Sequence, residues 1–192
     1  MDLQKIGMKF FAGDGNTISL VDFIPVFHRW IQGDALGHLL IDVADYSHVH
    51  DGPGIVLVAH EGNYAVDETG GRRGMVYYSK REPAEDIQKC LAVVCRRVLR
   101  ACRLLEQEES LGGPLKFSGN EVQIFANDRL IAPNTDQTMK ILEPALTAFL
   151  DGLFPDNPYR LEQEKDPNER FSVSIRAAEP VTIATLLARI GE

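Results

Sequence analysis

One long amphipathic segment constrains the fold of this chain more than any other part of the sequence. Between about 84 and 108, apolar residues recur at spacings of three and four, which is the period of one face of an α-helix. The members of this face are Ile87, Leu91, Val94, Val98, Cys102 and Leu105. Such a face must be buried to be stable, so we expect the helix 84–108 to pack on the core of the protein.

The first eighty residues are typical of strands joined by turns. Residues 3–20 predict a hairpin around the turn signal at 13–16, and a short helix at 22–32 follows, with Pro25 in its first turn. Further strand-like runs are 39–46, 55–61 and 74–80. Together these runs predict an antiparallel meander.

The part of the chain after the breaker at 111–114 mixes strands and helices. The predicted elements are a hairpin with strands at 121–126 and 129–131, a helix at 135–153, strands near 159–164 and 170–176, and a helix at 181–190. Pro144 should kink or restart the middle helix.

The order of these elements indicates the fold class. It lacks the regular strand–helix–strand alternation of a parallel sheet. We therefore predict an α+β protein, with a largely antiparallel sheet packed by the helix 84–108 and two later helices. We expect one compact domain over 1–192, or two α/β subdomains with a boundary near 111–116.

Composition limits the partners of the chain. Its 28 acidic residues against 20 Lys and Arg give a net charge of −8, which opposes broad contact with nucleic acid or an anionic membrane. No run approaches the roughly 20 apolar residues that cross a bilayer, and the first residues carry no signal-peptide core. Cys90, Cys95 and Cys102 lie too far apart along one predicted helix to bridge. We expect a cytoplasmic protein with reduced thiols that binds neither nucleic acid nor membrane.

The histidines mark the candidate site. All five fall between residues 28 and 60, interleaved with Asp42, Asp45, Asp51 and Glu61. They are His28, His38, His48, His50 and His60. Because imidazole titrates near neutral pH and is the commonest protein metal ligand, this crowding predicts proton transfer or a bound cation.

Strand parity selects two of these histidines. In an extended run from 39 to 50, side chains two residues apart point the same way, so His48 and His50 share a face with Asp42 and Tyr46. Both imidazoles can then meet one cation.

The register of the hairpin decides whether His60 joins them. If Pro53 and Gly54 are the only turn residues, His60 points away from His48 and His50; a wider turn reverses this.

Asp42 and Glu61 are the candidate acids. Asp42 lies among apolar residues, where a carboxylate is costly unless it is paired, hydrogen-bonded or metal-bound. The alternative is a buried structural acid that caps a loop or pairs with Arg29, and Glu61 allows the same two interpretations. His28 is expected to be a core residue with a polar tip, and His38 an exposed one.

A basic helix face is a second candidate. Arg96, Arg100 and Arg103 lie on one side of the helix 84–108, which carries no acid between Lys89 and Arg103. This face can bind an anionic ligand or partner. A solvated face paired with acids elsewhere is favoured in so acidic a chain.

Two functions follow from these features. The first is a metal-assisted or acid–base site, of hydrolytic type, on the hairpin: His48, His50 and His60 would hold a zinc-like divalent metal, with Asp42 or Glu61 as ligand or base. The alternative is a non-catalytic protein that binds a small molecule or forms a homodimer, in which the same residues make a structural polar network. Whether the chain is an enzyme stays open.

Overall fold

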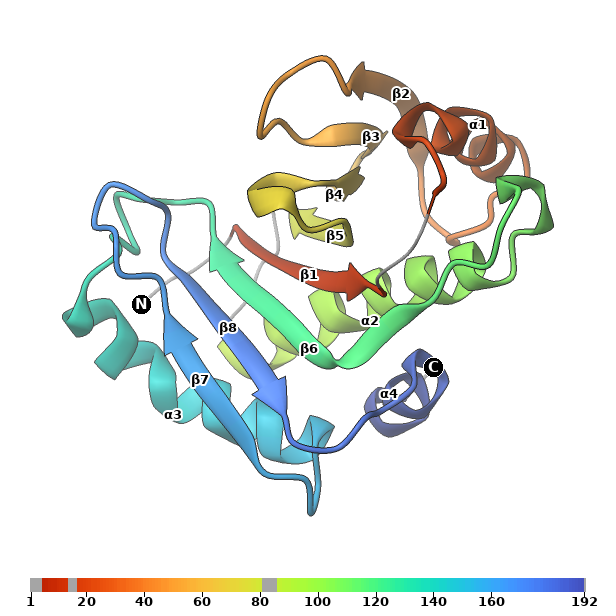
Figure 1. Cartoon of the computed structure of the whole chain (residues 1–192). Helices are drawn as coiled ribbons and strands as arrows, with labels where there is room; N and C mark the ends of the chain where they lie inside the picture. Colours follow the sequence, from red (N-terminus) through yellow and green to blue (C-terminus); the bar gives the residue numbers. More distant parts are fainter. Residues whose placement is uncertain (1–4, 14–16, 81–85, 192) are drawn as a thin grey trace.

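The computed structural model describes residues 5–13, 17–80 and 86–191, which form an eight-stranded antiparallel sheet and four α-helices (Figure 1). The strands are β1 (Ile6–Ala12), β2 (Leu40–Tyr46), β3 (Gly54–Ala59), β4 (Gly62–Asp67), β5 (Gly74–Ser79), β6 (Phe117–Ala126), β7 (Tyr159–Gln163) and β8 (Ser172–Ala177). The helices are α1 (Phe23–Gln32), α2 (Ile87–Glu106), α3 (Asp136–Leu153) and α4 (Ile183–Ile190). The prediction of an α+β protein with an antiparallel sheet is confirmed.

The chain passes twice through a similar order of elements. The first half runs β1, α1, β2 to β5 and α2, and the second runs β6, α3, β7, β8 and α4. In each half the last strand returns beside the first, because β5 pairs with β1 and β8 pairs with β6. Strands β1 and β6 pair with each other at the centre, so the strand order is β2-β3-β4-β5-β1-β6-β8-β7. One sheet therefore continues across the connection 107–116.

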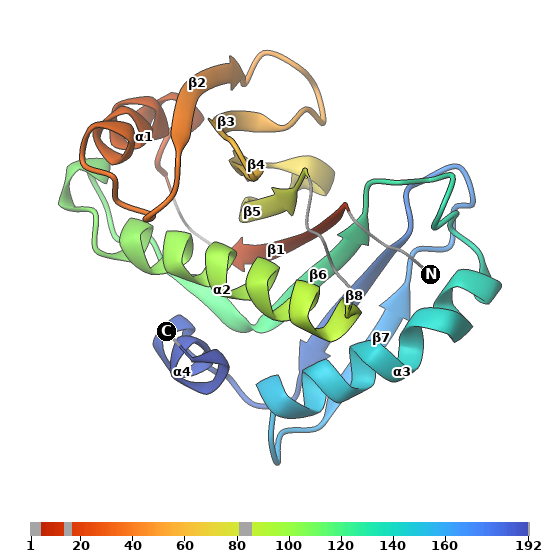
Figure 2. The ribbon, with the colours of Figure 1, turned by 180° about the vertical axis from the view of Figure 1, so that it is seen from behind.

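The helices lie on one face of this sheet (Figures 1 and 2). Helix α2 contacts β1 and β5 as well as α3 and α4, whereas α1 contacts β2 and β3. The side chains of Ile6, Met8 and Phe10 on β1 point into the main core beneath these helices, in agreement with the two-residue period of a strand.

The opposite face carries a second, smaller cluster, which includes Val56, Val76 and Phe125. Beside it lies a buried ion pair, in which Lys9 Nζ is 2.5 Å from Asp67 Oδ1. Lys9 also donates to the carbonyl oxygen of Arg72 at 2.7 Å. The buried ammonium group is thus satisfied by a carboxylate and by backbone.

Several predicted strands differ from the observed ones. Strand β4 was not predicted, β6 begins earlier than expected at Phe117, and residues 129–131 form a turn instead of a strand. The hairpin predicted over 3–20 is wrong in its described part, because β1 pairs with β5 and β6 and residues 17–19 form no strand. The predicted turn residues 14–16 lie outside the described residues.

The helices follow their expected limits more closely. Thr135 caps α3, where its hydroxyl accepts from Thr138 N at 3.3 Å, and α3 continues through Pro144 instead of restarting. Pro144 lies on the exposed side of the helix, where water can satisfy the carbonyl that it leaves unpaired. The first residues expected for α2, 84–85, are outside the described part. Among the described helices, none combines the length and apolar character that a membrane span requires.

Candidate functional site

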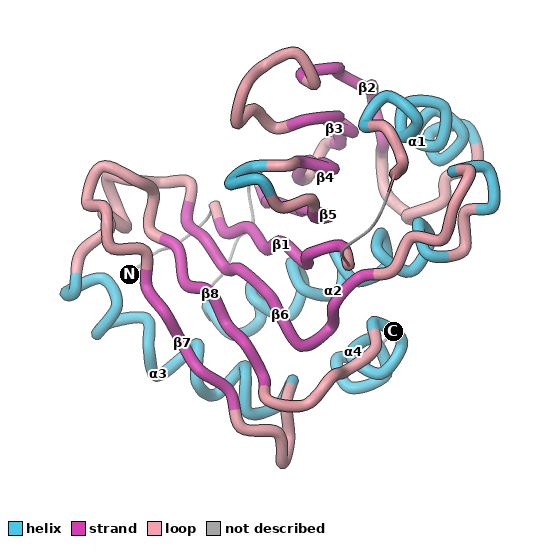
Figure 3. The backbone as a smooth tube through the Cα atoms, in the orientation of Figure 1, coloured by secondary structure: helices cyan, strands magenta, loops and turns pink. Residues whose placement is uncertain are grey.

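The structure places His48 and His50 in the turn 47–53 and not on a strand, because β2 ends at Tyr46 (Figure 3). Both histidines are exposed. His50 Nδ1 lies 3.7 Å from Asp51 Oδ2, and the His50 side chain is 97% exposed. The turn is wider than its Pro-Gly pair, which is the condition for His60 to share a site with His48 and His50. The predicted strand face that would present His48 and His50 to one cation, however, ends before these residues.

His60 lies at the other end of this hairpin. Tyr46 pairs with Gly54 at the turn, whereas the backbone N–H of His60 donates to Leu39 at the far end. The six residues of β3 separate His60 from the turn by roughly 20 Å. The structure therefore does not bring His60 to His48 and His50.

Asp42 is exposed, so the expected desolvation of its carboxylate is wrong. It lies on the edge strand β2, where Asp42 Oδ1 accepts from Val43 N at 2.8 Å. A bulge between Leu40 and Asp42 shifts the parity of the strand, so that Leu40 is buried and Ile41 is 53% exposed. The alternative partner, Arg29, instead pairs with Glu108 at 3.0 Å.

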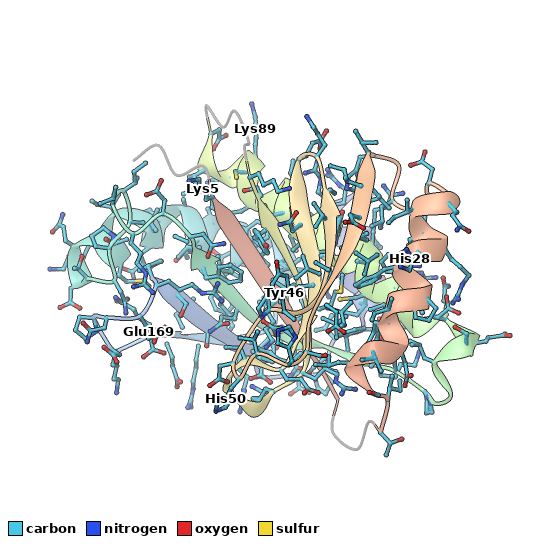
Figure 4. The ribbon with its side chains drawn as sticks, turned by 90° about the horizontal axis from the view of Figure 1, so that it is seen from above. Lys5, His28, Tyr46, His50, Lys89 and Glu169 are labelled. Atoms are coloured by element: carbon cyan, nitrogen blue, oxygen red, sulfur yellow. The ribbon has the colours of Figure 1, made fainter. Side chains whose placement is uncertain are left out.

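The tip of the hairpin forms an open hollow of about 430 Å³, lined in part by Tyr46, His50, Asp51 and Glu68. Figure 4 shows His50 at this tip, far from His28 on α1. Within residues 5–13, 17–80 and 86–191, no group of three or more His, Cys, Asp or Glu side chains has an arrangement that could hold a metal ion. A metal at the hairpin stays a prediction from the sequence.

The side chain of Glu61 points to the helices and contacts α2. Its carboxylate forms an ion pair with Arg97 on α2, and the same guanidinium donates to the hydroxyl of Tyr77 on β5. Gly62 makes room for this contact, since a Cβ there would lie 2.4 Å from the Tyr77 hydroxyl. Glu61 thus joins β4 and β5 to α2, and its side chain is 44% exposed.

His38, which the sequence suggested to be exposed, is half-buried beside this contact. Its Nδ1 is 3.0 Å from the carbonyl oxygen of Leu36, and its Nε2 is 3.2 Å from the hydroxyl of Tyr64. A carbonyl only accepts, so Nδ1 carries the proton and Nε2 accepts from Tyr64. Burial lowers the pKa of His38 below 6.5, and the charge of Arg97 acts in the same direction. The site therefore holds a neutral imidazole.

The arginines of α2 divide into two pairs. Arg96 donates to the carbonyl oxygens of Gly191 at 2.6 Å and Ile190 at 3.1 Å, so it secures the end of α4. Arg97 is held by Glu61 and Tyr77. Across the described part of the chain, Arg100 and Arg103 make neither an ion pair nor a side-chain hydrogen bond. None of the acids in residues 5–13, 17–80 and 86–191 pairs with these two residues, although the sequence favoured such pairing for this face.

Arg100 and Arg103 line an open cavity of about 300 Å³, which is no more enclosed than the hollow at the hairpin tip. It lies between the C-terminal half of α2, the turn after α1 and helix α4, an arrangement that can be followed in Figure 2. The other lining residues are Ala35, Leu104, Gln107 and Leu187. Residues 100, 103 and 104 lie on α2, and Gln107 caps its C-terminal end at the same helical spacing, so one side of the helix supplies both the charged and the amide groups.

A larger hollow of about 800 Å³ follows the edge strand β7. Some of its polar groups already have partners: Asn134 donates to the carbonyl oxygens of Glu164 and Asp166, and the Glu164 carboxylate accepts from Lys165 N. Its lining mixes the acids Asp136, Glu162 and Glu164 with one lysine, whereas the charged residues that line the cavity on α2 are both arginines.

Comparisons with protein-family models, curated proteins and solved structures find no match to this chain.

Proposed function

We propose that this chain is a binding protein that takes a small organic anion into the cavity on α2. The observation that supports this is the pair Arg100 and Arg103 at the edge of that cavity, which have no ion-pair or hydrogen-bond partner among the described residues. A guanidinium group presents planar N–H donors that match a carboxylate or a phosphate, often in a bidentate geometry.

The charge balance of the protein makes this pair unusual. The chain has 28 acidic residues for 20 Lys and Arg, yet none of the described acids pairs with either arginine. Like charges three residues apart on a helix destabilise it by about 0.2–0.5 kcal/mol. An anion between the two guanidinium groups would remove this repulsion.

The residues that line the cavity favour binding over catalysis. Besides the two arginines they are one alanine, two leucines and one glutamine. None of these side chains is a usual nucleophile or general base at neutral pH. The acid–base or metal-assisted role of the 42–61 hairpin, and a homodimer, remain separate predictions from the sequence.

Thermal unfolding with sodium acetate and with sodium phosphate, at an ionic strength matched by sodium chloride, tests the proposal. An anion at ten times its Kd stabilises the folded state by about 1.4 kcal/mol, so the melting temperature should rise by a few degrees. The Arg100→Gln/Arg103→Gln variant should lose this rise. The matched control is Lys140→Gln/Arg160→Gln, which removes two charges from exposed residues elsewhere.

The same measurement can overturn the proposal. An equal rise in wild type and in the Arg100→Gln/Arg103→Gln variant would show that the salt acts on the whole surface. No rise with either anion or with sodium hexanoate, up to concentrations of about 50 mM, would exclude a site of useful affinity.

A further inference from the structure

We infer that the occupant of the α2 cavity is a monocarboxylate with a short aliphatic tail. This inference rests on the proposed anion site and adds the chemical class of its ligand. It follows from the aliphatic residues in the cavity wall, from the burial of Leu187 among them, and from the net charge of the protein and the volume of the cavity.

Three of the six lining residues are aliphatic, namely Ala35, Leu104 and Leu187. They come from three different elements: the turn after α1, helix α2 and helix α4. A site for an inorganic ion would be expected to surround it with donors. This wall instead offers donors on α2 and an apolar surface beyond them, which suits an amphipathic ligand.

The depth of the side chains orients the ligand. Arg100 and Arg103 are exposed, whereas Leu187 is only 3% exposed. The charged groups therefore lie on the solvent-facing side of this open cavity, and the leucine lies on its buried side. The carboxylate would remain at the arginines, with Gln107 as a further amide donor, and the tail would enter toward Leu187.

Charge and size limit the ligand further. The net charge of −8 repels a multiply charged anion more strongly than a singly charged one. The cavity of about 300 Å³ lies at the lower end of the roughly 300–1,000 Å³ range of ligand sites. A single carboxylate with a short chain satisfies both limits.

Isothermal titration calorimetry with acetate, butanoate, hexanoate and octanoate tests this assignment. Burial of one methylene group contributes enough free energy to tighten binding about fourfold, so Kd should fall by about this factor per carbon until the cavity is full. Inorganic phosphate should bind more weakly than hexanoate.

Two variants separate the tail from the head group. Leu104→Ser should flatten the dependence on chain length while acetate still binds, and Ile141→Ser, an exposed position on α3, is its matched control. Arg100→Gln/Arg103→Gln should weaken every carboxylate. Circular dichroism of each variant checks that it is folded.

The outcomes distinguish the two proposals. Anion binding that depends on the arginines but not on chain length, or tighter binding of phosphate than of hexanoate, overturns the monocarboxylate and leaves the anion site standing. Chain-length dependence that persists without the arginines overturns both, because the fatty tail would then bind elsewhere.

Discussion

The ring of Phe125 on β6 lies directly against Gly7 on β1, its cross-strand partner. A Cβ atom at residue 7 would lie 2.2 Å from Phe125 Cζ, and the guanidinium carbon of Arg170 lies 3.6 Å from the centre of the same ring. Glycine allows this close approach at the strand pair that joins the two halves of the sheet.

Gly7→Ala should therefore destabilise the protein by about 1–3 kcal/mol, the usual cost of overpacking a buried contact. Urea unfolding measures the difference. Gly113→Ala is the control, since a Cβ there would meet no atom within 4 Å. Equal stability of the two variants would mean that the Phe125 ring moves aside without cost.

Lys9→Met should cost about 3–5 kcal/mol, because it leaves the buried carboxylate of Asp67 without its counter-ion. The double variant Lys9→Met/Asp67→Leu should recover part of this loss, since neither charge of the buried pair then remains. Lys140→Met removes a charge from an exposed residue and should change the free energy of unfolding by less than about 0.5 kcal/mol. A double variant less stable than Lys9→Met would contradict this account.

Glu121 should contribute to stability at neutral pH and lose this contribution in acid. Hydrogen bonds from Arg72 at 2.6 Å and from Arg176 at 2.8 Å lower the pKa of Glu121 from 4.5 to about 2. The contribution is complete above pH 4.5, the unfolded value, and is lost as the pH falls from 4.5 toward 2.

Glu121→Gln should thus lower the free energy of unfolding by about 1–2 kcal/mol at pH 7, after solvent screening, and by much less near pH 2. Denaturant unfolding across this range gives the comparison, with Glu143→Gln, an exposed acid on α3, as the control. A difference that stays constant with pH would mean that the charge of Glu121 is not responsible.

His38 should make the protein less stable as the pH falls through 6.5. The folded pKa of His38 is below that value, so the imidazole binds its proton more readily in the unfolded chain. Protonation therefore stabilises the unfolded state relative to the folded one. NMR titration of the imidazole measures the folded pKa directly. Tyr64→Phe should raise it, because the hydrogen bond to the neutral ring is lost. Tyr46→Phe, an exposed tyrosine on β2, should leave the midpoint of His38 unchanged.

The His60→Ala variant and the wild-type protein, both purified without an affinity tag, should contain the same amount of metal per chain. The reason is the length of β3, which keeps His60 roughly 20 Å from the turn that carries His48 and His50. Metal lost from all three single alanine variants would show that the hairpin can rearrange around a shared ion.

Residue spacing and local propensity predicted the elements that depend mainly on nearby residues. Helix α2 was expected because Leu91, Val94 and Val98 repeat at helical spacing, and its arginine face was visible for the same reason. Strand β4 was missed because Gly62 and Asn63 are poor strand formers, and its neighbours β3 and β5 supply the pairing that makes it a strand.

The site depended on contacts that the sequence does not encode locally. Gly191 binds Arg96 and Glu61 binds Arg97, which leaves Arg100 and Arg103 without such a contact among the described residues. Both Gly191 and Glu61 are distant from α2 in sequence. His38 acquires its partner Tyr64 only when the sheet brings β4 beside the turn after α1. Asp42 was misjudged because an apolar run looks buried, whereas an edge strand exposes part of it to water.

The return of β5 to β1 has a consequence for the order in which the sheet can be made. During synthesis the first half can close its own strand pairs while one side of β1 still has no partner. That partner ends at Ala126, 47 residues beyond the end of β5 at Ser79. At about 5–20 residues per second, a ribosome needs on the order of 2–10 seconds to supply it. Throughout that interval the future centre of the sheet is an open edge, at which a nascent chain is most vulnerable to pairing with the wrong strand.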